Sequence, residues 1–349
     1  MNRIKRENTL PVFNRLKWKC SPVVFTDRMV PKFSQYNYYT FQYDRSSHGF
    51  HFLNGVSRVD GCMVVERGKE GVVVVDVKKK ELLKVNDVDL SEVKHNEIVD
   101  LSVEGDRWEG DVLRNKPCGW GVLYDKDNHK VYEGFRIGAV NVCYGSTFYA
   151  DMESPDYEGV ICEGQRCGHG TQFDRNAGKL REGEWVCDIH ADKEMVLQNG
   201  NELFHNHVEE LVVSDNCQCG YHQVVLDLRL MPWLRRLCVG QDCFYSVGVV
   251  KLIGMKCLES VTIGEHSFTT ERGWLGNRVE HGNRFYLKDC PKLKELRIGS
   301  ESFSEYSVCN IENVDALETI EMGELMHSHL RFSFSYAMLE LKSILVHKE

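Results

Sequence analysis

Internal repetition constrains this chain more than any other feature, because two stretches repeat with different residue patterns. In the first stretch, an aromatic residue followed by Glu and Gly opens three nearly evenly spaced copies, at Trp108, Tyr132 and Tyr157. A degenerate fourth copy begins after the same interval, at Arg181, where arginine replaces the aromatic residue. In a repeat of this length each unit buries its apolar residues against its neighbours, so a stacked array is expected.

Each early copy contains two short runs that flank turn residues. The second runs cover 119–123, 144–148 and 168–173, and each contains glycine. Two short runs in which apolar and polar residues alternate, separated by a turn, predict a β-hairpin. The glycines permit tight turns and a close approach of neighbouring backbones. The aromatic residues at 108, 132 and 157 should then form one column, and the fourth copy should act as a cap.

This first array resembles the MORN repeat family from 108 to 187. The residues that carry the motif are Trp108, Glu109, Gly110, Tyr132, Glu133, Gly134, Tyr157, Glu158 and Gly159. The resemblance implies a hairpin array that acts as an interaction module, in some members linked to phosphoinositides. Lipid binding is not favoured here, because this stretch holds nine Lys and Arg against thirteen Asp and Glu, and anionic headgroups attract basic surfaces.

The second array follows the pattern Leu-x-x-Leu-x-Val/Ile-Gly. Its clearest copies open at Leu234, Leu258, Leu293 and Leu317, and weaker copies open at Val208 and Leu341. The spacing is regular except for a longer interval between Leu258 and Leu293. Apolar residues recur three and six positions before most opening residues. A phenylalanine follows each of three central copies, at Phe244, Phe268 and Phe303.

This second array resembles the leucine-rich-repeat family over about 208–346, which implies a solenoid with parallel strands on its concave face. The usual Asn ladder is missing. Asp242, His266 and Glu301 stand at the positions of that ladder. The convex side could therefore be irregular, and the array could belong to a divergent subclass of the family. The next column, Cys243, Ser267 and Ser302, is interpreted as small buried residues.

An alternating column of charge follows the opening residues. It reads Glu209, Arg235, Glu259, Lys294, Glu318 and Lys342. Parallel strands would bring these side chains ~4.8 Å apart, with an attractive pair at every step. Two interpretations stay open, a ladder that sets the strand register and a mixed-charge surface for a protein partner.

The long interval after Leu258 contains an insertion between Thr269 and Gly282 that could reach a partner or be a tolerated loop. An exposed Trp in a solenoid insertion is typical of a binding hot spot. The candidate protein-binding residues are Arg235, Arg236, Glu259, Trp274, Leu275, Lys294, Arg297 and Glu318.

The expected organisation is mainly β, a tandem solenoid in which a MORN β-hairpin array precedes a leucine-rich-repeat solenoid. The predicted domains are a basic tail at 1–19, an irregular β-rich cap at 20–104, the MORN array at 105–190 and the leucine-rich-repeat solenoid at 200–349. The tail, with six Lys and Arg against Glu7, is either a solvated segment or a targeting or membrane contact.

Composition limits the other functions. A net charge of -9 disfavours nucleic-acid binding. No apolar run is long enough for a transmembrane helix or a signal peptide, so a cytoplasmic protein with fourteen reduced cysteines is expected. Cys217, Cys219, His205, His207 and His222 match no common zinc spacing, and neither a metal nor any other cofactor is predicted.

Catalytic motifs for nucleotide, zinc-protease or serine-hydrolase chemistry are missing from the sequence. His48, His51, Asp44 and Cys62 are the polar residues of the cap that could carry chemistry, and scattered polar residues are usually surface ones. The sequence therefore predicts a non-enzymatic protein–protein interaction scaffold. The alternative is a peripheral membrane or cytoskeletal adaptor that uses the basic tail and the MORN segment.

Overall fold

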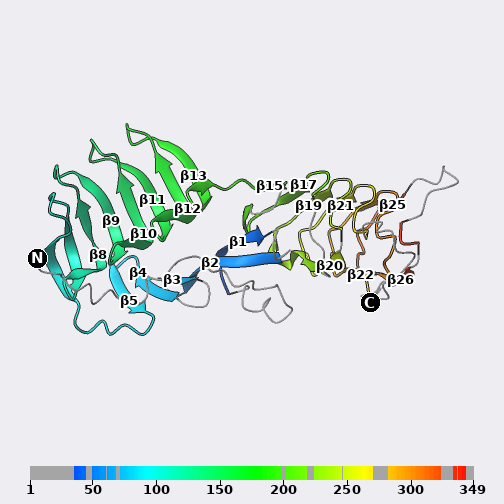
Figure 1. Cartoon of the computed structure of the whole chain (residues 1–349), viewed down its shortest axis with the longest axis horizontal. Helices are drawn as coiled ribbons and strands as arrows, with labels where there is room; N and C mark the ends of the chain where they lie inside the picture. Colours follow the sequence, from blue (N-terminus) through cyan, green and yellow to red (C-terminus); the bar gives the residue numbers. More distant parts are fainter. Residues whose placement is uncertain are drawn as a thin grey trace, which may run out of the picture. The chain divides into compact units, whose positions relative to one another are not determined.

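The computed structural model describes residues 35–44, 49–59, 61–67, 71–198, 202–217, 224–245, 247–269, 282–323, 333–335 and 337–342. The chain forms two compact units, the first with residues 35–40 and 53–191, the second with residues 41–52 and those from 192 onward. The described residues form strands and turns with one 3-10 helix, Leu228–Leu230 (Figure 1). The mainly β fold class predicted from the sequence is confirmed.

The first unit contains a nine-stranded antiparallel sheet whose strands follow one another in chain order (Figure 1). The strands are β6 (Lys94–Asp100), β7 (Arg107–Leu113), β8 (Lys116–Tyr124), β9 (Lys130–Ile137), β10 (Val140–Phe148), β11 (Pro155–Cys162), β12 (Gln165–Phe173), β13 (Lys179–Val186) and β14 (Ile189–His190). The hairpins β7–β8, β9–β10 and β11–β12 coincide with the first three sequence copies. Consecutive hairpins also pair with one another, so the sheet is continuous.

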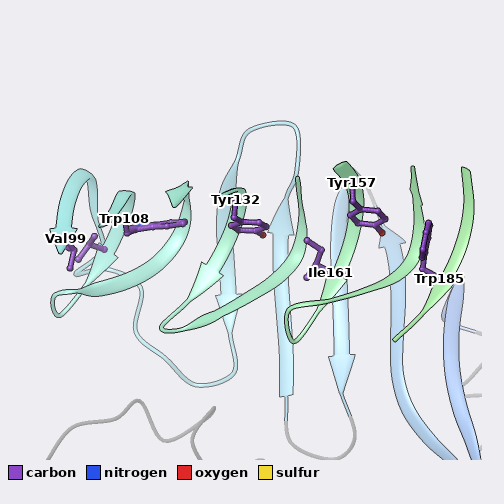
Figure 2. Packing of buried hydrophobic residues seen from close by; sticks show 7 residues of the cluster. Val99, Trp108, Tyr132, Tyr157, Ile161 and Trp185 are labelled. Carbon is purple, nitrogen blue, oxygen red and sulfur yellow. The ribbon is translucent and has the colours of Figure 1, made fainter. Parts of the chain in front are cut away.

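A row of glycines crosses this sheet, and the aromatic residues lie over it. Gly134 pairs with Gly145 across β9 and β10, and a Cβ atom on Gly145 would lie 2.5 Å from the Tyr132 hydroxyl. Figure 2 shows Trp108, Tyr132 and Tyr157 in one row over successive hairpins, and all three are buried. The glycines are therefore required because each ring occupies the space that a side chain would need.

The fourth copy keeps an aromatic residue in the row despite Arg181. Trp185 of β13 joins the buried cluster, and its ring centroid lies 5.5 Å from that of Tyr157 in an edge-on arrangement. The Trp185 indole donates to the Gly170 carbonyl oxygen at 3.2 Å. The aromatic row therefore continues through the last hairpin.

A β-meander is part of the same unit. It consists of the later part of β2 (Gly49–Val59) with β3 (Cys62–Arg67), β4 (Gly71–Asp76) and β5 (Glu81–Val85). Lys80, in the β4–β5 turn, lies 4.5 Å above the Trp120 ring and 3.3 Å from the Glu133 carboxylate. The unit boundary passes through β1 (Tyr38–Asp44) and β2; in the second unit, Phe41 stacks on Phe204 of β16 (Leu203–His205).

The second unit contains two parallel sheets, and from β17 onward the chain alternates between them. The first parallel sheet has six strands: β15 (Glu194–Leu197), β17 (Glu210–Val213), β19 (Arg236–Val239), β21 (Ser260–Ile263), β23 (Glu295–Ile298) and β25 (Thr319–Met322). The second has five: β18 (Val224–Asp227), β20 (Val247–Ile253), β22 (Arg284–Lys288), β24 (Val308–Glu312) and β26 (Met338–Lys342). The sequence allowed an irregular convex side. In the described residues that side is an ordered parallel sheet.

Aromatic and hydroxyl columns fill the turns after the first parallel sheet. Phe244, Phe268 and Phe303 stack with centroid distances of 5.0 and 4.7 Å, and Phe334 extends the stack at 4.7 Å. Beside them, the Ser267 hydroxyl donates to the Gly240 carbonyl oxygen at 2.8 Å and accepts the Cys243 N–H at 3.1 Å. These hydroxyls satisfy buried backbone groups of neighbouring repeats, so the column that the sequence assigned to packing is also a polar ladder.

The register predicted for the last copy is wrong. Leu341 pairs with Ile311 in the second parallel sheet, and Lys342 pairs with Glu312. Leu341 is therefore not an opening residue of the first parallel sheet, and Lys342 does not belong to the alternating charge column. The cause is an insertion in the sequence, because the interval from Phe303 to Phe334 is longer than the regular interval from Phe244 to Phe268.

The expectation of reduced cysteines is wrong for one pair. Cys162 and Cys167 form a disulfide across the β11–β12 turn, with their Cα atoms 6.0 Å apart. The preceding hairpin has buried Ile137 and Val142 at the equivalent positions. The repeat thus places two side chains at the base of the turn, and here both are cysteines. Ten further cysteines among the described residues are free.

Candidate interaction surface

One face of the first parallel sheet carries most of the predicted binding residues, and we call it the exposed face. Three columns of side chains form it. In strand order they are Lys193, Glu209, Arg235, Glu259, Lys294 and Glu318; Glu194, Glu210, Arg236, Ser260, Glu295 and Thr319; and Val196, Val212, Cys238, Thr262, Arg297 and Glu321. The intervening residues Leu237, Val261 and Leu296 are buried on the other side of the sheet.

Ion pairs connect the first four members of the first column. The Lys193 ammonium lies 2.5 Å from the Glu209 carboxylate, and Arg235 lies 3.8 Å from Glu209 and 2.9 Å from Glu259. The hydrogen bond from Lys193 lowers the pKa of Glu209, and the hydrogen bond to Glu259 raises the pKa of Arg235. The alternating signs therefore act as neighbouring attractive pairs in this part of the column.

The column continues across the long sequence insertion. The Lys294 N–H donates to the Glu259 carbonyl oxygen at 2.8 Å, and the Glu318 N–H donates to the Lys294 carbonyl oxygen at 2.9 Å. The inserted residues therefore do not separate β21 from β23. Trp274 and Leu275, the two candidates within the insertion, lie outside the described residues.

The other two columns differ in chemistry. Arg236 forms an ion pair with Glu210 in the second column, and Arg297 lies 3.5 Å from Glu321 in the third. The first four members of the third column carry no charge. They are Val196, Val212, Cys238 and Thr262, and we call them the apolar strip. Val196 is 39% exposed, and burial raises the pKa of the Cys238 thiol.

Sequence reasoning missed two residues near this face. Lys193 begins the charge column, but its strand has Asp192 where the pattern requires Leu, and it lies closer to the next copy than the regular spacing predicts. Trp233 is 55% exposed in the turn before β19, with its ring centroid 6.4 Å from that of His207. Trp233 could have been found from the sequence, because this residue directly precedes the opening residue Leu234.

The residues of the repeated aromatic-Glu-Gly motif have two different placements. The aromatic residues and glycines are part of the core. Glu109, Glu133 and Glu158 lie on the sheet in one row, separated by Val122 and Ser146. These carboxylates have local partners, such as Arg107 at 2.7 Å for Glu109 and the Tyr144 hydroxyl at 2.7 Å for Glu158. The motif therefore builds the sheet, and its acids contribute a polar row.

The described residues bring together one group that could hold a metal, Asp125, Asp127 and His129 in the β8–β9 turn. Asp125 already accepts the backbone N–H groups of Asp127 and His129 at 3.0 and 2.8 Å. The cluster considered from the sequence is different. Its members His205 and His207 have their ring centroids 6.4 Å apart, and Cys219 and His222 lie outside the described residues.

The cap residues considered for catalysis form no described site. The side chains of Asp44, His48 and His51 lie outside the described part of the chain, and Cys62 is a half-buried free thiol. Within the described ranges no helix has the length and apolarity needed to cross a bilayer.

No family model matches the chain, and no curated protein matches it significantly.

Proposed function

We propose that this chain is a non-enzymatic protein–protein interaction scaffold, in which a MORN-type hairpin array is joined to a divergent leucine-rich-repeat solenoid. The exposed face is the observation that carries this proposal. It is a surface of six strands with an apolar strip among paired charges, and protein interfaces combine apolar contact area with polar groups that provide specificity. Ion pairs that hold side chains in place before a partner arrives would lower the entropy cost of binding.

The remaining parts of the proposal follow from the sequence. No nucleic acid, cofactor or metal is proposed as a ligand, and we propose a cytoplasmic location. The ten free thiols support a reducing compartment, whereas the Cys162–Cys167 disulfide is more typical of an oxidising one.

Affinity capture from an extract of the source organism tests the scaffold function with the full chain. Thr262→Arg places a bulky cation on the apolar strip, where Thr262 is exposed. Val103→Arg makes the same change in charge in a turn of the first unit, where Val103 is fully exposed. We expect partners that the unmodified chain captures to be lost with Thr262→Arg and kept with Val103→Arg. Equal capture by all three chains would refute the exposed face as the binding surface.

A further inference from the structure

The charges around the apolar strip indicate which kind of protein segment could bind there. The exposed face carries five basic and seven acidic residues, a difference of -2. The turns that follow its strands form one border of the face, which we call the acidic border. It contains five acidic residues and no Lys or Arg over 214–217, 240–245, 264–269 and 299–306: Asp215, Asp242, Glu265, Glu301 and Glu305.

The acidic border adjoins the apolar strip. Val212 and Thr262 of the strip lie three residues before Asp215 and Glu265, at the same ends of β17 and β21. The opposite border is nearly balanced, because its turns contain Arg229, Lys256 and Lys292 against Asp289 and Asp315, and Arg229 forms an ion pair with Asp227 of β18. Among the described residues of these turns, a ligand on the strip therefore meets more negative than positive charge on one side.

Uncharged donors orient two carboxylates of the border. Asp215 accepts the backbone N–H of Gln241 at 2.8 Å, and Asp242 accepts the Tyr245 hydroxyl at 2.8 Å. These donors carry no formal charge, so they leave the negative charge of both carboxylates in place. His266 lies 3.9 Å from Asp242 and 4.0 Å from Glu301, and it can become a cation when its ring is protonated.

We propose that the exposed face binds an extended, cationic segment of a partner protein, with apolar side chains on the strip and Lys or Arg side chains at the acidic border. This inference rests on the proposed scaffold function and assigns the chemistry of the partner. Four adjacent strands span about 14 Å, because three strand spacings of about 4.8 Å separate them. An extended segment of about four residues covers that distance at roughly 3.3 Å per residue. Complementary charge would speed association and reject acidic competitors.

Short synthetic peptides test this chemistry with the full chain. One peptide alternates Lys with Val, a second alternates Glu with Val, and a third alternates Lys with Ser. We expect the Lys–Val peptide to bind at least about tenfold more tightly than the Glu–Val peptide, in agreement with charge selection, and more tightly than the Lys–Ser peptide, because only valine buries apolar area on the strip. Isothermal calorimetry gives the three dissociation constants.

A matched pair of variants locates the binding. Glu265→Lys reverses an exposed charge of the acidic border, and Glu104→Lys makes the same change at an exposed position of the first unit. We expect Glu265→Lys to weaken Lys–Val binding several-fold and Glu104→Lys to leave it unchanged. Equal weakening by both variants would overturn the proposal, because it would show general attraction to an acidic chain.

The outcomes separate this proposal from the scaffold function. Binding of the Glu–Val peptide at least as tightly as the Lys–Val peptide, or of neither peptide, would overturn the cationic assignment. The scaffold function would still stand if Thr262→Arg abolished capture from the extract. It would fall if capture did not depend on Thr262.

Discussion

At the scale of single residues, charges on the exposed face are arranged by strand register. Arg235 is placed between Glu209 and Glu259 because each residue directly precedes one of three neighbouring strands, at the same level of the sheet. The pairs are exposed, so each contributes little by itself and less at high salt. Their effect is cumulative, because a change of sign at one position affects both neighbours.

Glu259→Lys should destabilise the second unit more than Thr262→Lys. Glu259 accepts Nε and Nη2 of Arg235 at 3.0 and 2.9 Å, so the substitution replaces an attractive pair with a repulsion and adds a second repulsion at Lys294. Thr262→Lys adds positive charge between Cys238 and Arg297 and removes no pair. Thermal unfolding should give a lower Tm for Glu259→Lys at low salt, with a smaller difference at high salt. Equal Tm values at low salt would show that the ladder does not form.

His205 should make stability depend on pH. Its Nε2 lies 3.1 Å from the Asp192 carbonyl oxygen, and the His207 N–H donates to its Nδ1 at 3.3 Å, an arrangement that fits a neutral ring. Burial lowers the pKa of His205 from 6.5 to about 4. The unfolded chain therefore binds the proton first as the pH falls below 6.5, and stability is lost between pH 6.5 and 4. By linkage this loss is about 2 kcal/mol between pH 7 and 5.

His205→Gln provides the comparison for that prediction. Glutamine has no proton to gain in this range, so the free energy of unfolding should fall less between pH 7 and pH 5 than in the unmodified chain. Urea titrations at both pH values measure the difference. An identical loss in both chains would assign the pH dependence to other groups.

At the scale of elements, two kinds of contact hold successive repeats together, and each depends on a small residue. In the first unit, glycines leave room for aromatic rings. In the second unit, the Ser267 hydroxyl connects the backbones of successive turns. Both kinds of contact lie at positions that recur from one copy to the next, so they act along the whole array.

Gly145→Ala should destabilise the hairpin sheet. A Cβ atom there would lie 2.5 and 2.6 Å from Oη and Cε2 of Tyr132, and overpacking of this kind costs about 1–3 kcal/mol. At Gly71 a Cβ atom would meet nothing within 4 Å, so Gly71→Ala is the matched control. Thermal unfolding followed by tryptophan fluorescence should show a lower Tm for Gly145→Ala alone. A shift of the same size in both variants would contradict the packing of the ring on the glycine.

Ser267→Ala should cost about 1–3 kcal/mol of stability, because it leaves the buried Cys243 N–H and the Gly240 carbonyl without their partner. Ser267→Cys should cost less. Cys243 holds the same column, and its thiol lies 3.1 Å from the Ser214 carbonyl oxygen. Urea unfolding of the two variants gives the comparison. A smaller loss for alanine than for cysteine would contradict the hydroxyl ladder.

The sequence predicted the hairpins and strands correctly where the repeats are regularly spaced. It predicted three of the hairpins and the position of Glu259 between Arg235 and Lys294 in one column. It could not assign the last copy, because an insertion shifted the register and Leu341 fits two apolar columns. It also missed the second parallel sheet, since columns placed three and six residues before the opening Leu show burial but not strand pairing.

At the scale of the whole molecule, each unit builds an ordered sheet from repeats, and the second leaves one face uncovered in the described residues. Four of the candidate binding residues could be predicted as a charge column, whereas the apolar strip could be predicted only in part. The repeat pattern places Cys238 beside Thr262 in an exposed column, but Val196 belongs to a strand without an opening Leu. Pairing in the sheet brings them into one column.

The alkylation rate of Cys238 tests the central claim, that the exposed face binds the partner, most directly. Cys238 is an exposed free thiol on the apolar strip, and Cys62 is a half-buried free thiol of the first unit that serves as the internal control. Mass spectrometry after timed alkylation of the full chain, with and without the captured partner, gives both rates. We expect the partner to slow alkylation of Cys238 several-fold and to leave Cys62 unchanged. An unchanged rate at Cys238 in the saturated complex would contradict binding at the exposed face.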